Sequence, residues 1–261
     1  MRKPILTCML FLFATIAFTA CGSKQTQNHQ EKQKQAEAFR NLGEAYLQQG
    51  NYAAALKELI KAETLTPGDP YLQNVMGRAY LGRERFDMAI QYFKKALELK
   101  PDFAQASNNL GATYLAQQKW DEAIPIFTEL SQNILYGTPH FAFSNLGYAY
   151  YNKNMYGAAK ENYLKALDLE PRFVIALRGL GKTYLAMGQN QKAAESFEKA
   201  VEIAPKYPEL HSDLAKAYIA SKNFSKAYGA LEKTIELASK ESELSKEALD
   251  ILSQLRRKGL K

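Results

Sequence analysis

Few side chains in this 261-residue sequence have the types and spacing that catalysis or metal binding requires. The three histidines, His29, His140 and His211, are far apart, and none has a second ligand at the spacing of a zinc site. The triplet Gly181-Lys182-Thr183 matches the end of a phosphate-binding loop, but Ala176 stands where that motif needs its first glycine. We therefore predict a protein that is not an enzyme and that uses no metal or cofactor.

The N-terminal residues have the pattern of an export signal. Arg2 and Lys3 precede an almost wholly apolar run, residues 5–18, which is too short to span a bilayer comfortably. We predict that residues 1–20 are a signal peptide. The sequence has two cysteines, Cys8 inside this signal and Cys21 directly after it, so we expect the exported protein to form no internal disulfide.

The segment Phe18-Thr19-Ala20-Cys21 resembles a bacterial lipobox. The resemblance implies that Cys21 becomes the lipidated first residue of the exported protein. Gly22 rather than Asp follows the cysteine, which implies the outer membrane. The alternative is an ordinary signal peptide cut near Ala20, with Cys21 as an unmodified thiol. Residues 22–34 contain no apolar side chain, so we predict that residues 21–35 are the lipidated cysteine and a flexible tether.

Downstream, one small residue recurs at a nearly constant interval. The gaps are 34, 34, 36, 34 and 34 residues between Gly43, Gly77, Gly111, Gly147, Gly181 and Ala215. A period of about 34 residues with Gly and Ala at fixed offsets is typical of tetratricopeptide repeats (TPRs), in which each repeat is one helical hairpin. A small residue at this position lets the two helices of a hairpin approach closely.

Other residues keep the same phase. A large apolar or aromatic residue follows each small residue after sixteen positions: Leu59, Phe93, Phe127, Tyr163, Phe197 and Leu231. Four repeats close with a proline: Pro67, Pro101, Pro171 and Pro205. Asp69-Pro70 and Thr138-Pro139 have the pattern of an N-cap followed by a first-turn proline. We predict an all-α, right-handed TPR superhelix, with six helix-turn-helix repeats over residues 36–241 and a capping helix over residues 242–261.

The charge pattern excludes one class of partner. The formal net charge is +7, with lysine and glutamate mixed throughout the predicted helices. This surplus indicates either solvated helix faces or attraction to anionic lipid or an acidic partner. No basic stripe interleaved with aromatic residues is present, so we expect no nucleic-acid partner.

The repeats predict a concave surface for a protein partner. In TPR hairpins the first helix lines this surface through positions 2, 5, 9 and 12. Applied to repeats two to five, this rule predicts a groove that combines aromatic, amide and basic side chains: Tyr71, Asn74, Arg78, Asn108, Phe141, Tyr148, Tyr151, Arg178 and Lys182. Aromatic and arginine side chains often dominate binding energy, and asparagine can both donate to and accept from an extended backbone.

The whole exported chain resembles the type IV pilus pilotin lipoproteins. The resemblance rests on the lipobox, the six repeats and the linker Leu135-Tyr136-Gly137-Thr138-Pro139, which leads into the aromatic-rich residues 141–151. It implies a lipid anchor at Cys21, an outer-membrane location facing the periplasm and a groove that binds a secretin subunit during secretin assembly. The alternative is a general cell-envelope adaptor that recruits peptidoglycan enzymes or outer-membrane assembly factors.

Overall fold

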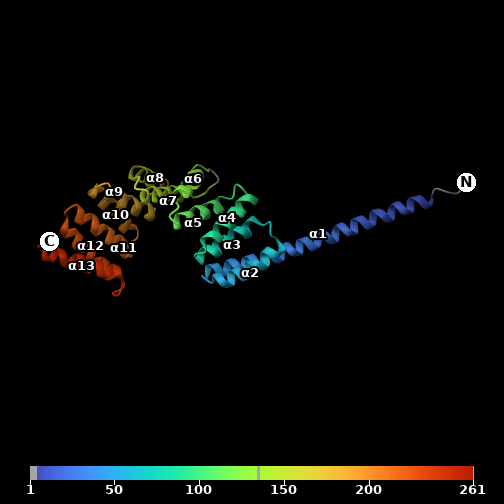
Figure 1. The fold of residues 1–261 in the computed structure, drawn as a ribbon, viewed down its shortest axis with the longest axis horizontal. Coiled ribbons are helices and arrows are strands. Elements are labelled where there is room, and N and C mark those ends of the chain that lie inside the picture. The colour runs from blue at the N-terminus through green and yellow to red at the C-terminus, as the bar shows by residue number, and fades with distance from the viewer. Residues whose placement is uncertain (1–4, 134–135, 261) are drawn as a thin grey trace. The chain divides into compact units, whose positions relative to one another are not determined.

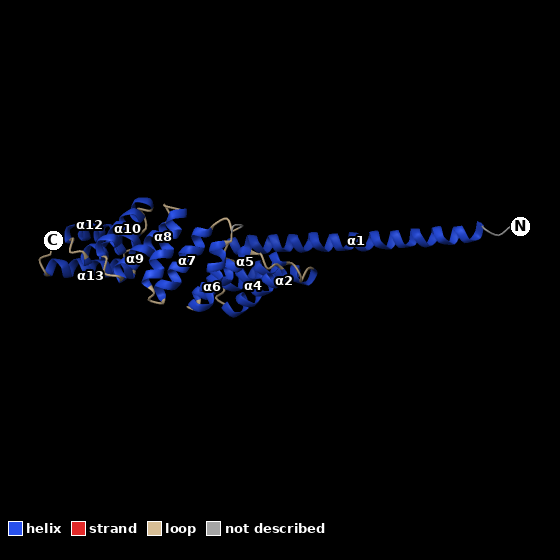
Figure 2. Cartoon of the chain, turned by 90° about the horizontal axis from the view of Figure 1, so that it is seen from above, coloured by secondary structure: helices blue, strands red, loops and turns tan. Residues whose placement is uncertain are grey.

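We describe the protein from a computed structural model that covers residues 5–133 and 136–260, with side chains from residue 27 onward. These residues form 13 helices and no strand, which confirms the predicted all-α class (Figure 2). The chain divides into two compact units, Met1–Thr113 and Tyr114–Lys261. Each unit is a series of helical hairpins joined by short loops (Figure 1).

The helices of the first unit begin with the long α1. They are α1 (Ile5–Gln48), α2 (Tyr52–Leu65), α3 (Pro70–Gly82), α4 (Phe86–Leu99) and α5 (Ala104–Ala116), whose last residues belong to the second unit. The C-terminal part of α1 packs against α2 and α3, and α3 packs against α4. The buried residues of α2 and α3 form one apolar cluster with Ala36 of α1.

The second unit contains the remaining helices. They are α6 (Trp120–Gln132), α7 (Pro139–Asn152), α8 (Tyr156–Leu169), α9 (Val174–Ala186), α10 (Asn190–Ile203), α11 (Pro208–Ala220), α12 (Phe224–Leu237) and α13 (Glu243–Arg257). The first helices of successive hairpins, α7, α9, α11 and α13, each contact the next. This arrangement places one row of first helices side by side, where residues from several repeats can line one surface.

The small residues of the repeat lie against the large residues sixteen positions later. A Cβ added to Gly77 would lie 2.5 Å from the ring of Phe93, and a Cβ added to Gly181 would lie 2.7 Å from the ring of Phe197. Both rings are fully buried. Glycine is therefore required at these two positions, because the methyl group of an alanine would hold the helices of the hairpin apart.

The turn inside each hairpin has its own repeated signature. Each of the six turns has one residue with positive φ, and these residues recur with the same gaps as the small residues: Gly50, Glu84, Gln118, Asn154, Gly188 and Lys222. This left-handed conformation costs little for glycine and more for residues with a Cβ. The chain nevertheless uses glycine at two of the six turns, so the hairpin packing imposes the conformation on the other four.

The proline pattern predicts the helix ends correctly. The helices before Pro67, Pro101, Pro171 and Pro205 all end two residues before the proline. The Asp69 side chain caps α3 by accepting a hydrogen bond from the backbone N–H of Tyr71 at 2.8 Å. Thr138 occupies the N-cap position of α7, but its side chain makes no capping hydrogen bond, so here the fixed φ of Pro139 supports the helix start.

The predicted tether differs from the structure in its conformation. Residues 27–35 are exposed, as their composition requires, but they form part of α1 rather than an irregular segment. Glutamine, lysine and glutamate favour helix, and nothing in residues 27–35 breaks it. The side chains of Cys8 and Cys21 lie outside the described residues. Within the part of the chain that the structure describes, no helix is long and apolar enough to cross a membrane.

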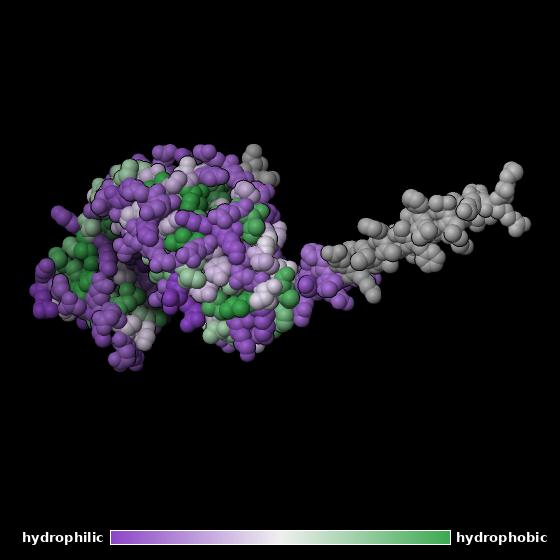
Figure 3. Space-filling model, turned by 45° about the vertical axis from the view of Figure 1, so that its right-hand side comes forward, coloured by the Kyte–Doolittle hydropathy of each residue, from purple (hydrophilic) through white to green (hydrophobic). Residues whose placement is uncertain are grey.

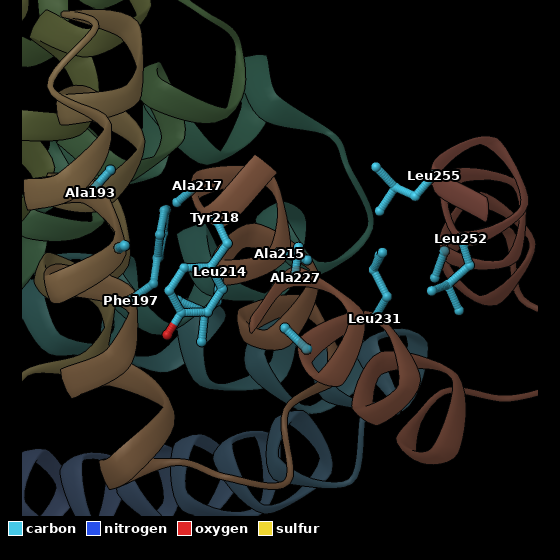
Figure 4. Packing of buried hydrophobic residues seen from close by; sticks show 13 residues of the cluster. Ala193, Phe197, Leu214, Ala215, Ala217, Tyr218, Ala227, Leu231, Leu252 and Leu255 are labelled. Carbon is cyan, nitrogen blue, oxygen red and sulfur yellow. The ribbon is translucent and has the colours of Figure 1, made fainter. Parts of the chain in front are cut away.

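The C-terminal helix α13 completes the core of the second unit. Ala248, Leu252 and Leu255 of α13 belong to the same buried cluster as Leu231 of α12 and Phe197 of α10. Figure 4 shows Leu252 and Leu255 on the side of α13 that faces Leu231. Hydrophilic residues cover much of the surface in the space-filling view, with hydrophobic side chains in groups between them (Figure 3). The apolar side of α13 thus covers the end of the repeat stack, as solenoid stability requires.

Candidate binding cleft

A cleft of about 760 Å³ lies across the first helices of the second unit. Helices α7 and α9 form its two main walls, α8 contributes one tyrosine, and the start of α11 closes one side. The lining residues are Ser144, Asn145, Tyr148, Tyr151, Asn152, Tyr163, Val174, Ile175, Arg178, Gly179, Lys182, Ala204, Tyr207, Glu209 and Leu210. This size and mixture of apolar walls with a few polar groups are typical of a ligand-binding site.

The wall formed by α7 is aromatic. Tyr148 is 47% exposed and packs edge-on against Trp120 of α6, with ring centroids 5.8 Å apart. Tyr151 packs against Tyr156, with centroids 5.7 Å apart. Burial and the nearby Tyr156 and Asp213 raise the pKa of Tyr151, so its hydroxyl stays protonated and can donate a hydrogen bond at neutral pH. Rigid aromatic side chains of this kind supply large contact area at low entropic cost.

The floor of the cleft depends on a glycine. A Cβ added to Gly179 of α9 would lie 2.3 Å from Cζ of Tyr163, whose side chain is 3% exposed. Because residue 179 has no side chain, the ring of Tyr163 reaches from α8 past α9 to the cleft. Burial raises the pKa of the Tyr163 hydroxyl well above its usual value. The cleft floor is therefore a neutral phenol.

The two basic side chains of the cleft, Arg178 and Lys182, lie close to the carboxylate of Asp213, which is not itself a lining residue. Nε of Arg178 donates to Oδ2 of Asp213 at 2.6 Å, and Nζ of Lys182 lies 3.9 Å from the same oxygen. Burial lowers the pKa of Lys182, and the neighbouring Arg178 and Lys216 lower it further, while Asp213 opposes this effect. Lys182 is thus a partly desolvated cation whose nearest carboxylate is beyond hydrogen-bond distance.

Four of the predicted groove residues come together in this cleft: Tyr148, Tyr151, Arg178 and Lys182. The predicted Phe141 lies outside the lining, at the start of α7. It is 41% exposed and packs against Phe173, with ring centroids 4.9 Å apart. The rule based on repeat positions therefore locates the centre of the cleft but not its limits.

The other predicted groove residues belong to the first unit. Tyr71 is 47% exposed, and its hydroxyl accepts a hydrogen bond from Nζ of Lys100 at 2.9 Å. Arg78 and Asn108 are half-buried on α3 and α5. The prediction that Asn74 faces a partner needs correction, because this side chain is 2% exposed and accepts from Nδ2 of Asn109 at 2.9 Å. Asn74 therefore joins α3 to α5.

Sequence reasoning missed several residues of the site. Tyr163 was recognised as a core residue, but its reach into the cleft depends on Gly179. Tyr207 precedes α11 and lies outside the position rule, although it is 62% exposed. Asp213 lies one residue after Ser212, which is position 5 of the sixth repeat, so the position rule does not identify it. Extending the rule to that repeat would have identified Glu209.

His140 and His211 contact other residues of the helical core and loops. His140 packs against Phe141 and Phe173, with centroid distances of 4.5 Å and 5.1 Å. His211 is buried, and its Nε2 lies 2.8 Å from the carbonyl oxygen of Pro205. Among the described residues, no group of three or more His, Cys, Asp or Glu side chains could hold a metal ion.

Family models of the tetratricopeptide repeat match most of the chain. One matches residues 34–102, a second matches residues 74–133 and 144–208, and a third matches residues 184–249. The predicted TPR fold is confirmed by these matches together with the helix order. No curated protein sequence matches the chain significantly.

Solved structures with the same fold include two proteins that align with this chain over almost their whole length. The crystal structure of PilW, a "widely conserved type IV pilus biogenesis factor", matches with a TM-score of 0.76 and 23% identity, over 82% of this chain and 98% of PilW. Pseudomonas aeruginosa PilF matches with a TM-score of 0.72 and 20% identity, over 83% of this chain and 97% of PilF. YrrB, described as "a TPR protein with an unusual peptide-binding site", matches with a TM-score of 0.54 and 20% identity, over 74% of this chain and 97% of YrrB. At these identities the similarity establishes the fold.

Proposed function

Because this chain is built of tetratricopeptide repeats, we propose that it is a non-catalytic scaffold that binds an extended segment of a protein partner in the cleft between α7, α9 and α11. The observation that carries this proposal is the gathering of exposed apolar and aromatic side chains with two cations in one open cleft. Ile175 and Tyr207 are 61% and 62% exposed, and Tyr148 is 47% exposed. Exposed apolar surface of this kind, bounded by polar groups, marks an interaction site.

The size and form of the cleft fit a peptide segment. A volume of about 760 Å³ holds a few residues of an extended chain. Asn145 and Asn152 place amide groups beside the aromatic wall, where they can bond to a peptide backbone. Apolar side chains of the partner would be buried against Tyr148 and Ile175, while the backbone keeps its hydrogen bonds.

We further propose that the partner belongs to the machinery of type IV pilus assembly, with a secretin subunit as the specific partner. The fold similarity to PilW over nearly the full length of PilW supports this proposal. Lipidation of Cys21 and anchoring at the periplasmic face of the outer membrane belong to the same proposal. They rest on the lipobox-like segment before Cys21.

A deletion strain tests the proposed role. Loss of the gene should remove heat-resistant secretin multimers and abolish twitching motility, and the wild-type gene should restore both. A gene carrying Tyr148→Ala and Tyr151→Ala should fail to restore them although the protein accumulates normally. Normal secretin multimers in the deletion strain would contradict the secretin role and favour the alternative, a general envelope adaptor.

A further inference from the structure

The proposed function leaves open what distinguishes the partner segment from any other extended chain. Resting on that proposed function, we propose that the cleft selects a segment with an acidic side chain flanked on both sides by apolar residues. In this arrangement Arg178 and Lys182 bind the ligand carboxylate, and Asp213 acts as a positioning residue for Arg178.

Positive charge exceeds negative charge around Arg178 and Lys182. Within the described residues, Asp213 is the one carboxylate within 4.0 Å of Arg178 or Lys182. The third nearby cation, Lys216, has its own partner in Glu247 at 2.9 Å. Two cations therefore share one carboxylate, and a second carboxylate would complete the group. Charge complementarity of this kind sets binding specificity.

Glu209 does not supply this missing charge. It lines the cleft at the second residue of α11, four residues before Asp213. Four residues of helix correspond to about 6 Å along the axis. Glu209 therefore lies about one helical turn from the level of the two cations, and among the described residues it forms no ion pair with either.

The bond between Arg178 and Asp213 orients the guanidinium. Asp213 accepts from Nε of Arg178, which leaves the N–H groups of the two terminal nitrogens for a ligand. A guanidinium held through Nε offers these groups as a planar pair that matches the two oxygens of a carboxylate. The Asp213 side chain is 13% exposed, so the anchor is shielded from solvent while Arg178, at 37%, stays accessible.

Apolar surface lies on both sides of the two cations. Ile175 lies one turn before Arg178 in α9, and Tyr207, the residue before α11, lines the same cleft. Tyr148 lies 34 residues before Lys182, at the equivalent level of the preceding repeat. A ligand that places a carboxylate at Arg178 thus meets apolar surface before and after it. This geometry fits an acidic residue inside a segment rather than the carboxylate at a chain end.

Three synthetic heptapeptides test the proposal by calorimetric titration of the folded protein. The first is SLVELVS with both ends blocked, the second is blocked SLVQLVS, and the third is SLVQLVS with a free C-terminal carboxylate. We expect the blocked SLVELVS to bind about tenfold more tightly than blocked SLVQLVS, a difference of about 1.4 kcal/mol. The double variant Arg178→Gln, Lys182→Gln should reduce this ratio to about one.

Variants of Asp213 separate positioning from stability. Asp213→Asn keeps an acceptor for Nε of Arg178 but removes the competing charge, so it should bind blocked SLVELVS several-fold more tightly and leave blocked SLVQLVS unchanged. Asp213→Ala removes both the acceptor and the competing charge. The ratio of the affinities for blocked SLVELVS and blocked SLVQLVS should then fall toward one. A purely structural role would change the affinity for both peptides together, and circular dichroism checks that each variant is folded.

Each other outcome has a definite meaning. Equal affinities for the two blocked peptides, both lost in Tyr148→Ala, would refute the charge selection and leave the proposed cleft function intact. Tightest binding of the free-carboxylate peptide would refute the assignment to an internal acidic residue. Absence of binding by all three peptides at about 1 mM would contradict both the inference and the proposed function.

Discussion

The indole ring of Trp120 lies edge-on to the phenol ring of Tyr148, with ring centroids 5.8 Å apart and ring planes at 79°. Trp120 is the one tryptophan of the chain. Tyr148 lines the cleft, so this contact connects an optical probe directly to the proposed binding surface. A ligand that packs against Tyr148 must change the surroundings of the indole.

We therefore predict that peptide binding changes the fluorescence of Trp120. Titration with blocked SLVELVS should give a saturable change in emission, with the same midpoint as calorimetry. The variant Tyr148→Ala should shift the emission of the free protein, because the indole loses its neighbour, and should abolish most of the titration signal. An unchanged emission at saturating peptide would show that the ligand binds elsewhere.

Tyr148 and Tyr151 carry the second prediction. The double variant Tyr148→Ala, Tyr151→Ala should weaken partner binding by about 2 kcal/mol or more, because aromatic anchors dominate interface energy. Tyr148 is 47% exposed, so we expect only a modest loss of thermal stability. Leu164→Ala on α8 is a matched control, since Leu164 is 38% exposed and does not line the cleft. A large drop in melting temperature without a specific binding defect would mean that these rings support the core.

The contact between Gly179 and Tyr163 gives a prediction on stability. Gly179→Ala forces a methyl group against the ring of Tyr163, so we expect destabilisation of about 1–3 kcal/mol and a displaced cleft floor. Gly229→Ala is the control. Gly229 lies inside α12 with no atom within 4 Å of an added Cβ, so alanine there should stabilise the protein by about 0.5–1 kcal/mol. Urea unfolding of both variants compares them directly, and equal effects would contradict the close packing.

Lys182 predicts a dependence of stability on pH. Burial lowers the pKa of Lys182 in the folded protein below that of the unfolded chain. The unfolded chain therefore binds this proton more tightly than the folded protein does. As a result, the free energy of unfolding increases as the pH rises through the folded-state pKa of Lys182. Lys182→Met should remove this contribution, so its stability relative to the wild type should be highest at neutral pH and decrease in the alkaline range. Thermal melts across pH 7–10 measure the difference, and a constant difference would contradict the burial of this charge.

Cys21 carries the prediction on anchoring. Cys21→Ser removes the sulfur that a lipid would modify, so the variant should move from the membrane to the soluble fraction of cells. Cys8→Ser is the control, because Cys8 lies inside the predicted signal and should not affect partition. Unchanged membrane partition of Cys21→Ser would leave the ordinary signal peptide as the better interpretation.

Much of the fold follows from the repeated residues. Gly77 and Gly181 predict close helix approach, and their neighbours Phe93 and Phe197 were predicted from spacing alone, because a short helical hairpin gives local contacts at a fixed separation. The turn conformations were missed, although Gly50, Gly188 and Asn154 carried a signal for positive φ. Glu84 and Lys222 obscured it, since their side chains do not favour that conformation.

The site was predictable where it depends on position in the repeat and not where it depends on contacts between repeats. Tyr148 and Lys182 follow from their positions on the first helices. Asp213 orients Arg178 across a distance of 35 residues in sequence, and no local pattern marks that pair. Asn74 shows the opposite error, because its position suggests exposure whereas its side chain is buried and hydrogen-bonded to Asn109.

The central claim, that the cleft holds a protein partner in the cell, is tested most directly by photocrosslinking. A benzophenone amino acid at position 148 in the cleft should capture one partner, and the same group at position 169, where Leu169 is 52% exposed on α8, should not. We predict that the species captured from position 148 is a secretin subunit and disappears with Arg178→Gln, Lys182→Gln. Equal capture from both positions, or capture unaffected by loss of the two cations, would contradict the account.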